Sequence, residues 1–232
     1  TEAIKPRTEN TPTATALRLA AMEACVIHAA AKAELEQRFD ANNWPPFIDT
    51  CRHDPDPRIR ILFGRWAGIA QSPSAIGWLT GQLRDTEPQV RDAALLSLGR
   101  LTSPEAKIAL SEFARKESGR ARALTVTALA RWGIEEVLPY RADSHQEVRI
   151  AVARGLAQHR TAASAQELRS MFSDPHPDVQ AAVLSAAQTW PEPWKTGLLL
   201  EAVRVGSLAT RKAASYVLRE QYAQLTELPI EA

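Results

Sequence analysis

The sequence predicts an all-α fold, a right-handed α-solenoid of about six helix pairs with an N-terminal capping helix. Two observations predict it. A short box recurs along the chain, in which an Asp is followed, after four residues, by a β-branched apolar residue and then a long polar one. Its clear copies begin at Asp54, Asp85, Asp143 and Asp174. After each box, small and apolar residues follow the 3.6-residue period of an amphipathic helix, and no stretch shows useful strand alternation.

The spacing of the boxes indicates a repeat protein. Their apolar anchors lie at positions 59, 90, 121, 148, 179 and 210, which gives steps of 31, 31, 27, 31 and 31 residues. Repeats of this length are single supersecondary units that bury their apolar faces by stacking on one another. Each unit reads as two helices, with the box at the start of the second. The short step predicts a stubby helix around residues 134–140.

The segments before and after the repeats have a different character. Residues 1–13 are polar and contain two prolines, so we expect a flexible leader. Residues 14–41 form an Ala-rich amphipathic stretch, the natural N-terminal cap of a solenoid. Residues 42–225 hold the repeats, and residues 226–232 read as a frayed tail. We expect one elongated cooperative unit rather than two domains.

Composition excludes several classes of protein. The 28 Lys and Arg residues balance 27 Asp and Glu residues, and this near-neutral charge argues against nucleic acid as the partner. Two cysteines make no disulfide framework, and no apolar run is long enough to span a membrane. No nucleotide-binding, metalloprotease or hydrolase motif is present. We therefore expect a cytoplasmic protein with no catalytic residues, no cofactor and no metal.

The boxes, with the small residues and Leu that follow them, resemble HEAT-like repeats of the phycobilisome-lyase type. The resemblance covers residues 42–225. Each box Asp lies in a turn, where its carboxylate can accept backbone N–H groups. The resemblance further implies that this Asp pairs with the box Arg of a neighbouring repeat, which builds a ladder. Lys116 and Gln180 depart from the pattern, so we expect a weaker ladder around repeats three and five. The ladder residues are Asp54, Asp85, Asp143, Asp174, Arg60, Arg91, Arg122, Arg149 and Arg211.

The outward side of each second helix is the candidate binding surface. Positions −1, +2, +6 and +10 from each anchor point away from the packed layer, and we call these positions the second-helix face. In the first four repeats this face carries six arginines against two acids, with isoleucine and leucine among them. Arginine pairs with carboxylate or phosphate and also stacks on aromatic rings. The partner-binding candidates are Arg58, Ile61, Arg65, Ile69, Leu96, Arg100, Arg120, Arg131, Ile150 and Arg154.

These features favour a non-catalytic protein-interaction scaffold or adaptor that binds an acidic, partly apolar segment of another protein. One alternative is an ordinary solvated helix face, with the assigned phase off by one residue. Another is a HEAT-like enzyme or enzyme subunit. An alkylpurine DNA glycosylase would use groove tryptophans such as Trp132 and Trp190 with Asp92 or Asp178, whereas a bilin lyase rests on the family name alone.

A metal site is not expected. His145 and His176 share one position in adjacent repeats, but two imidazoles without a third ligand make a poor zinc site.

Overall fold

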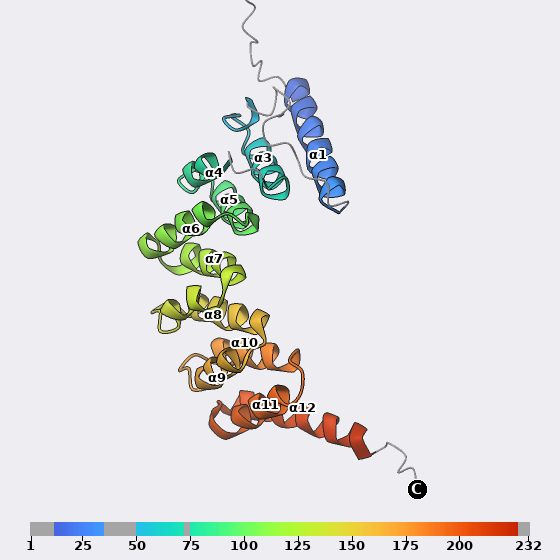
Figure 1. The fold of residues 1–232 in the computed structure, drawn as a ribbon, viewed down its shortest axis with the longest axis vertical. Helices are drawn as coiled ribbons and strands as arrows, with labels where there is room; N and C mark the ends of the chain where they lie inside the picture. Colours follow the sequence, from blue (N-terminus) through green and yellow to red (C-terminus); the bar gives the residue numbers. More distant parts are fainter. Residues whose placement is uncertain (1–11, 35–49, 72–74, 227–232) are drawn as a thin grey trace, which may run out of the picture. The chain divides into compact units, whose positions relative to one another are not determined.

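The computed structural model describes residues 12–34, 50–71 and 75–226, and every regular element in these ranges is helical. The helices follow one another as the pairs of an α-solenoid (Figure 1). The chain divides after Leu110 into two compact units, which we describe separately. No helix in the described ranges is long and apolar enough to cross a membrane.

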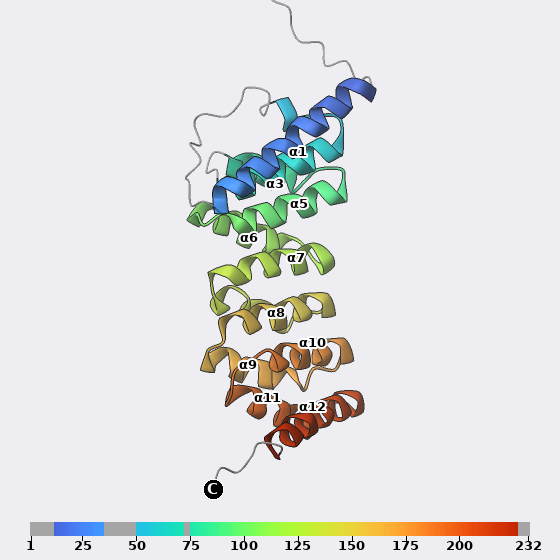
Figure 2. The ribbon, with the colours of Figure 1, turned by 90° about the vertical axis from the view of Figure 1, so that its right-hand side faces the viewer.

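The N-terminal unit is built around two second helices, α3 (Pro57–Ile69) and α5 (Pro88–Arg100). The short helix α4 (Ile76–Gln82) packs on α5, and α1 (Pro12–Glu34) packs on the side of α3 (Figure 2). Helix α1 thus begins inside the expected leader, and the end expected for it at residue 41 lies outside the described residues. Helix α6 (Pro104–Lys116) contains the division between the units.

The C-terminal unit continues the same alternation of helices. The second helices α7, α8 and α10 pack on one another in sequence, and α11 pairs with α12. The stubby element expected around residues 134–140 is a series of 3₁₀ turns. The helical elements of the C-terminal unit after α6 are α7 (Gly119–Leu129), η2 (Ala130–Trp132), η3 (Ile134–Glu136), η4 (Leu138–Tyr140), α8 (Gln146–His159), α9 (Ala162–Met171), α10 (Pro177–Gln188), α11 (Trp194–Val205) and α12 (Leu208–Thr226).

Proline fixes where several second helices begin. Pro57, Pro88 and Pro177 each occupy the first turn, where the missing N–H costs no hydrogen bond and the fixed φ suits a helix. The Asp56 side chain completes the start of α3 by accepting the Arg58 amide at 2.9 Å. The boxes are therefore helix starts as well as repeat markers.

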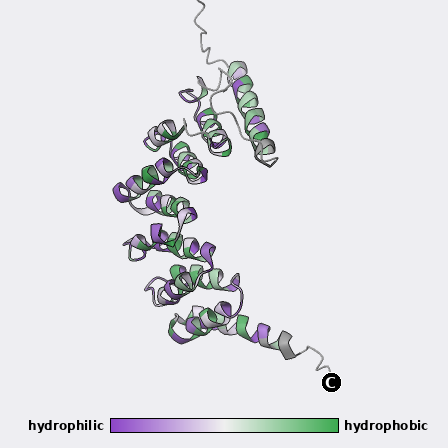
Figure 3. Cartoon of the chain, in the orientation of Figure 1, coloured by the Kyte–Doolittle hydropathy of each residue, from purple (hydrophilic) through white to green (hydrophobic). Residues whose placement is uncertain are grey.

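The apolar anchors of the boxes form part of the buried core. The β-branched anchor of each clear box, namely Ile59, Val90, Val148 or Val179, is fully buried. Apolar and polar residues interleave along the helices, as one buried and one exposed side require (Figure 3). Each anchor therefore fixes the rotation of its helix, and with it the side that faces solvent.

Candidate functional site

The aspartate of each clear box organises its own turn. One carboxylate oxygen accepts the backbone N–H of the residue two positions later. The donors are the amides of Asp56, Glu87, His145 and His176, at 2.9, 2.9, 2.9 and 2.8 Å. This is the Asx turn, in which a short acidic side chain takes the place of a backbone acceptor. It sets the direction in which α3, α5, α8 and α10 start.

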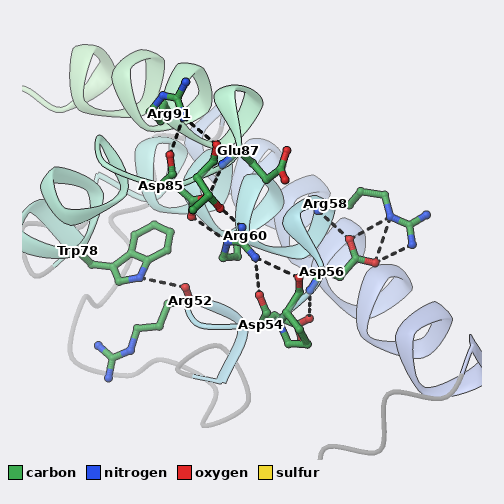
Figure 4. A network of polar contacts seen from close by, with 11 residues as sticks. Arg52, Asp54, Asp56, Arg58, Arg60, Trp78, Asp85, Glu87 and Arg91 are labelled. Carbon is green, nitrogen blue, oxygen red and sulfur yellow. Dashed lines mark hydrogen bonds and ion pairs between the residues drawn. The ribbon is translucent and has the colours of Figure 1, made fainter. Parts of the chain in front are cut away.

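The box arginine joins its own turn to the next repeat. Arg60 donates through Nη1 to the Asp54 carbonyl at 2.7 Å, and through Nε and Nη2 to the two carboxylate oxygens of Asp85 at 2.9 Å each (Figure 4). In the C-terminal unit Arg149 does the same, with the Asp143 carbonyl at 2.8 Å and the Asp174 carboxylate at 2.7 and 3.0 Å. Such two-pronged contacts are among the strongest side-chain pairs.

Two other rungs show how the pattern adapts. Arg122 also pairs with the aspartate of the next repeat, Asp143. In repeat three, where Lys116 stands in place of the box aspartate, Arg122 donates through Nε to the Ala114 carbonyl at 3.0 Å. At the N-terminal end, Arg18 of α1 lies 2.7 Å from the Asp54 carboxylate, although its N–H is not aligned for a hydrogen bond. Helix α1 thus supplies the cation that a preceding repeat would supply.

Arg91 makes the incomplete rung. Among the described residues its guanidinium donates only to the carbonyl oxygens of Asp85 and Thr86, at 2.6 and 3.0 Å. Arg211, which extends the pattern in repeat six, is exposed and makes no ion pair with any described residue.

A neutral rung replaces the ion pair after repeat five. The Gln180 amide donates to the Asp174 carbonyl at 2.7 Å, as the arginines do to their own turns. Its Oε1 accepts the Ser207 amide at 2.8 Å and the Thr210 hydroxyl at 2.9 Å. Gln180 and Thr210 are both buried, and these hydrogen bonds satisfy polar groups that water cannot reach. The sequence predicts a weaker ladder here, and in the structure Ser207 and Thr210 take the place of the aspartate, so neutral hydrogen bonds replace the ion pair.

Ion pairing sets the charge state of the ladder acids. Burial on its own raises the pKa of Asp85, Asp143 and Asp174. The hydrogen bonds from the neighbouring guanidinium and from the turn amide outweigh burial, so the pKa of each carboxyl lies below its ordinary value. These acids are ionised structural groups near neutral pH, and they are poor candidates for proton transfer.

The second-helix face has the exposure that a binding surface requires. None of the residues at its four positions is buried in any of the six repeats. A phase shifted by one residue would expose Ile59, Trp66 and Ala70, and all three are buried. The alternative of a misassigned phase is therefore wrong.

An open groove of about 500 Å³ runs over the second-helix face of the N-terminal unit. Leu96 is 51% exposed at this surface, and Ile61 and Ile69 are half-buried, so the floor is largely apolar. We call it the α3/α5 groove. Its lining residues come from α1, α3 and α5: Val26, Ile61, Arg65, Ile69, Gln89, Asp92, Ala93, Leu96, Ser97 and Arg100.

The arginines of this unit differ in their partners. Arg65 and Arg100 are exposed, line the groove and form no ion pair with any described residue. Arg58 does not line the groove, and its guanidinium instead holds Asp56 at 2.6 Å. That contact holds the pKa of Asp56 below its usual value. The structure therefore distinguishes Arg58, which pairs with the helix-capping Asp56, from Arg65 and Arg100, which are exposed and line the groove.

The second-helix face of the C-terminal unit is less apolar. Arg120, Arg131 and Arg154 are exposed, and Ile150 is half-buried against the core. In repeats five and six the same positions carry small, polar and mixed-charge residues together with the exposed Tyr216.

The profile of the HEAT repeat family matches residues 44–130 and 134–219, which is most of the chain. The chain belongs to the HEAT repeat family.

Among solved structures, this HEAT repeat chain is similar to the complex of CpcE and CpcF of phycocyanin lyase from Nostoc sp. PCC7120. The identity is 15%, the match covers 95% of this chain and 99% of that chain, and the TM-score is 0.43. No curated protein sequence matches the chain.

Two further groups considered from the sequence do not line the α3/α5 groove. Trp190, a candidate groove aromatic, is buried and makes an edge-on contact with Trp194 at a centroid distance of 6.0 Å, so it cannot stack on a ligand; Trp132 is half-buried. His145 and His176 are the N-cap residues of α8 and α10. The His176 side chain accepts the Asp178 amide at 3.3 Å, whereas the His145 side chain makes no cap hydrogen bond. In the described ranges, no three His, Cys, Asp or Glu residues are placed to hold a metal ion.

Proposed function

We propose that this HEAT repeat chain is a non-catalytic protein-interaction module that binds an acidic, partly apolar segment of another protein on its second-helix face. The observation that carries the proposal is the α3/α5 groove, where two arginines with no ion pair to any described residue flank the exposed Leu96 and the half-buried Ile61 and Ile69. Apolar anchors supply most of the affinity of a protein interface, whereas charges set orientation and association rate. Because Cys25 and Cys51 are free thiols, we keep the cytoplasm as the expected compartment.

The experiment that tests this proposal uses the chain as bait for capture from native lysate, at low and at high salt. We compare the unchanged chain with Leu96→Glu and with the double variant Arg65→Glu/Arg100→Glu. Arg115→Glu is the matched control, because Arg115 is an exposed arginine on α6 outside the groove. Far-UV circular dichroism and urea unfolding confirm that each variant is folded.

The expected result is a salt-sensitive protein partner that both groove variants lose at least tenfold and that Arg115→Glu retains. Cross-linking should place the contact on an acidic segment of that partner. A partner that binds all four chains equally would contradict the proposal. Recovery of nucleic acid or of a bound tetrapyrrole in place of a protein would favour the enzyme alternatives.

A further inference from the structure

The two walls of the α3/α5 groove share one period. On α3, Ile61, Arg65 and Ile69 follow at intervals of four residues, as do Asp92, Leu96 and Arg100 on α5. Each interval is about one helical turn, or about 6 Å along the axis. Ile69 and Arg100 both stand ten residues after their anchors, so the two arginines, on neighbouring helices, are offset by one turn.

This layout places charge on both sides of an apolar strip. Arg65 and Leu96 share one repeat position, and Ile69 and Arg100 share the next, so charge and apolar surface alternate across the groove as well as along it. Packed helices lie about 8 to 10 Å apart. A ligand must therefore present two carboxylates on opposite flanks of an apolar strip, one turn apart.

The chemistry of the groove also limits the backbone of its ligand. An extended segment carries N–H and C=O groups that need partners, which an edge strand, polar side chains or water must supply. The floor here is aliphatic, and the helices that form the walls use their own backbone groups internally. A helical ligand satisfies its own backbone and needs only side-chain contacts.

We propose, resting on the function proposed above, that the occupant of the α3/α5 groove is an amphipathic helix of the partner protein. Its apolar strip packs on Ile61, Ile69 and Leu96. Two of its carboxylates, five residues apart on opposite flanks, pair with Arg65 and Arg100. Residues five apart on a helix are separated by about 140° and about 7.5 Å, which fits one-turn-offset cations on two neighbouring helices. The span from Ile61 to Ile69, about 12 Å, accommodates two to three turns.

A displayed library of random 16-residue peptides tests this inference on the 232-residue chain. Peptides are selected on the unchanged chain and depleted on Leu96→Glu, and the consensus peptide is then synthesised. Its dissociation constant is measured by fluorescence anisotropy with the unchanged chain, Arg65→Glu, Arg100→Glu and the control Arg115→Glu. A second peptide carries proline at the centre, which breaks a helix but leaves composition nearly unchanged.

The selected peptides should show apolar residues every three or four positions and acids five apart. The central proline should weaken binding at least tenfold. Arg65→Glu should weaken it by a similar factor, and a single Glu→Lys change in the peptide should restore that loss. Arg115→Glu should leave binding unchanged.

The failures of the two proposals are distinguishable. Selected acidic peptides that tolerate the central proline, or that alternate apolar and polar residues, would overturn the helical occupant while leaving the acidic, apolar ligand in place. If no peptide distinguishes the unchanged chain from Leu96→Glu, the groove is not a binding site, and the proposed function fails with the inference.

Discussion

Replacing Arg149 by Met should destabilise the chain more than any change at an exposed ion pair. Arg149 donates two hydrogen bonds to the Asp174 carboxylate and one to the Asp143 carbonyl, and the two charged side chains are 12% and 8% exposed. The substitution leaves a nearly buried carboxylate with the His176 amide as its remaining strong donor. Breaking a buried pair in this way costs about 3 kcal/mol of unfolding free energy.

A double-mutant cycle isolates the pair from other losses. Asp174→Asn keeps an acceptor for the His176 amide but removes the charge, and we expect it to cost about 2 kcal/mol because the Arg149 guanidinium loses its counter-charge. When residue 174 is a neutral Asn, removing the Arg149 guanidinium costs less unfolding free energy than it does beside the Asp174 carboxylate. The combined variant Arg149→Met/Asp174→Asn should therefore cost well under the sum of the two, with a coupling free energy of about 2 kcal/mol.

Urea unfolding followed by far-UV circular dichroism measures each corner of the cycle, provided that the slope with denaturant is the same for all four chains. The matched control is the cycle Arg58→Met/Asp56→Asn, in which Arg58 is 67% exposed and Asn retains the helix-capping role. That coupling should be too small to resolve, because solvent screens an exposed pair. Additive effects at Arg149 and Asp174 would refute the argument that the ladder is a buried, coupled network.

Two further predictions concern the pH dependence of the ladder and the close packing at Gly68. The pKa of Asp174 is depressed in the folded chain, so its stabilisation is fully present above the ordinary pKa of about 4 and is lost as the pH falls through the lower folded value; urea midpoints between pH 7 and pH 2.5 should fall on acidification, and less steeply in Asp174→Asn. An unchanged slope would mean that this carboxyl is not paired in solution. Gly68→Ala should destabilise by about 1 to 3 kcal/mol because the added Cβ would lie 2.9 Å from the Ser97 Cα, whereas Gly77→Ala, which meets no atom within 4 Å, should stabilise α4 by up to about 1 kcal/mol. Equal effects in thermal unfolding would show that close packing at Gly68 does not decide its identity.

The sequence by itself determined the repeat and the rotation of its helices. A β-branched anchor in near-constant phase must be buried if the helices are to stack, and every residue at a fixed offset from it then has a known exposure. That is why the positions of Arg65, Leu96 and Arg100 on the exposed face could be assigned without coordinates. The role of the turn aspartates could be predicted equally well from the sequence, because an Asp just before a helix start commonly accepts a backbone N–H of its own turn.

Only the tertiary structure decided which of these residues share a site. Arg58 and Arg65 occupy equivalent kinds of position in the sequence, yet one holds Asp56 and the other lines the groove. The hydrogen bonds that Ser207 and Thr210 donate to Gln180, the burial of Trp190 and the docking of Arg18 on Asp54 depend on contacts between residues far apart in the chain. Periodicity fixes the direction of a side chain about its own helix axis, but whether that side chain meets a partner depends on the neighbouring helix, which a local pattern does not encode.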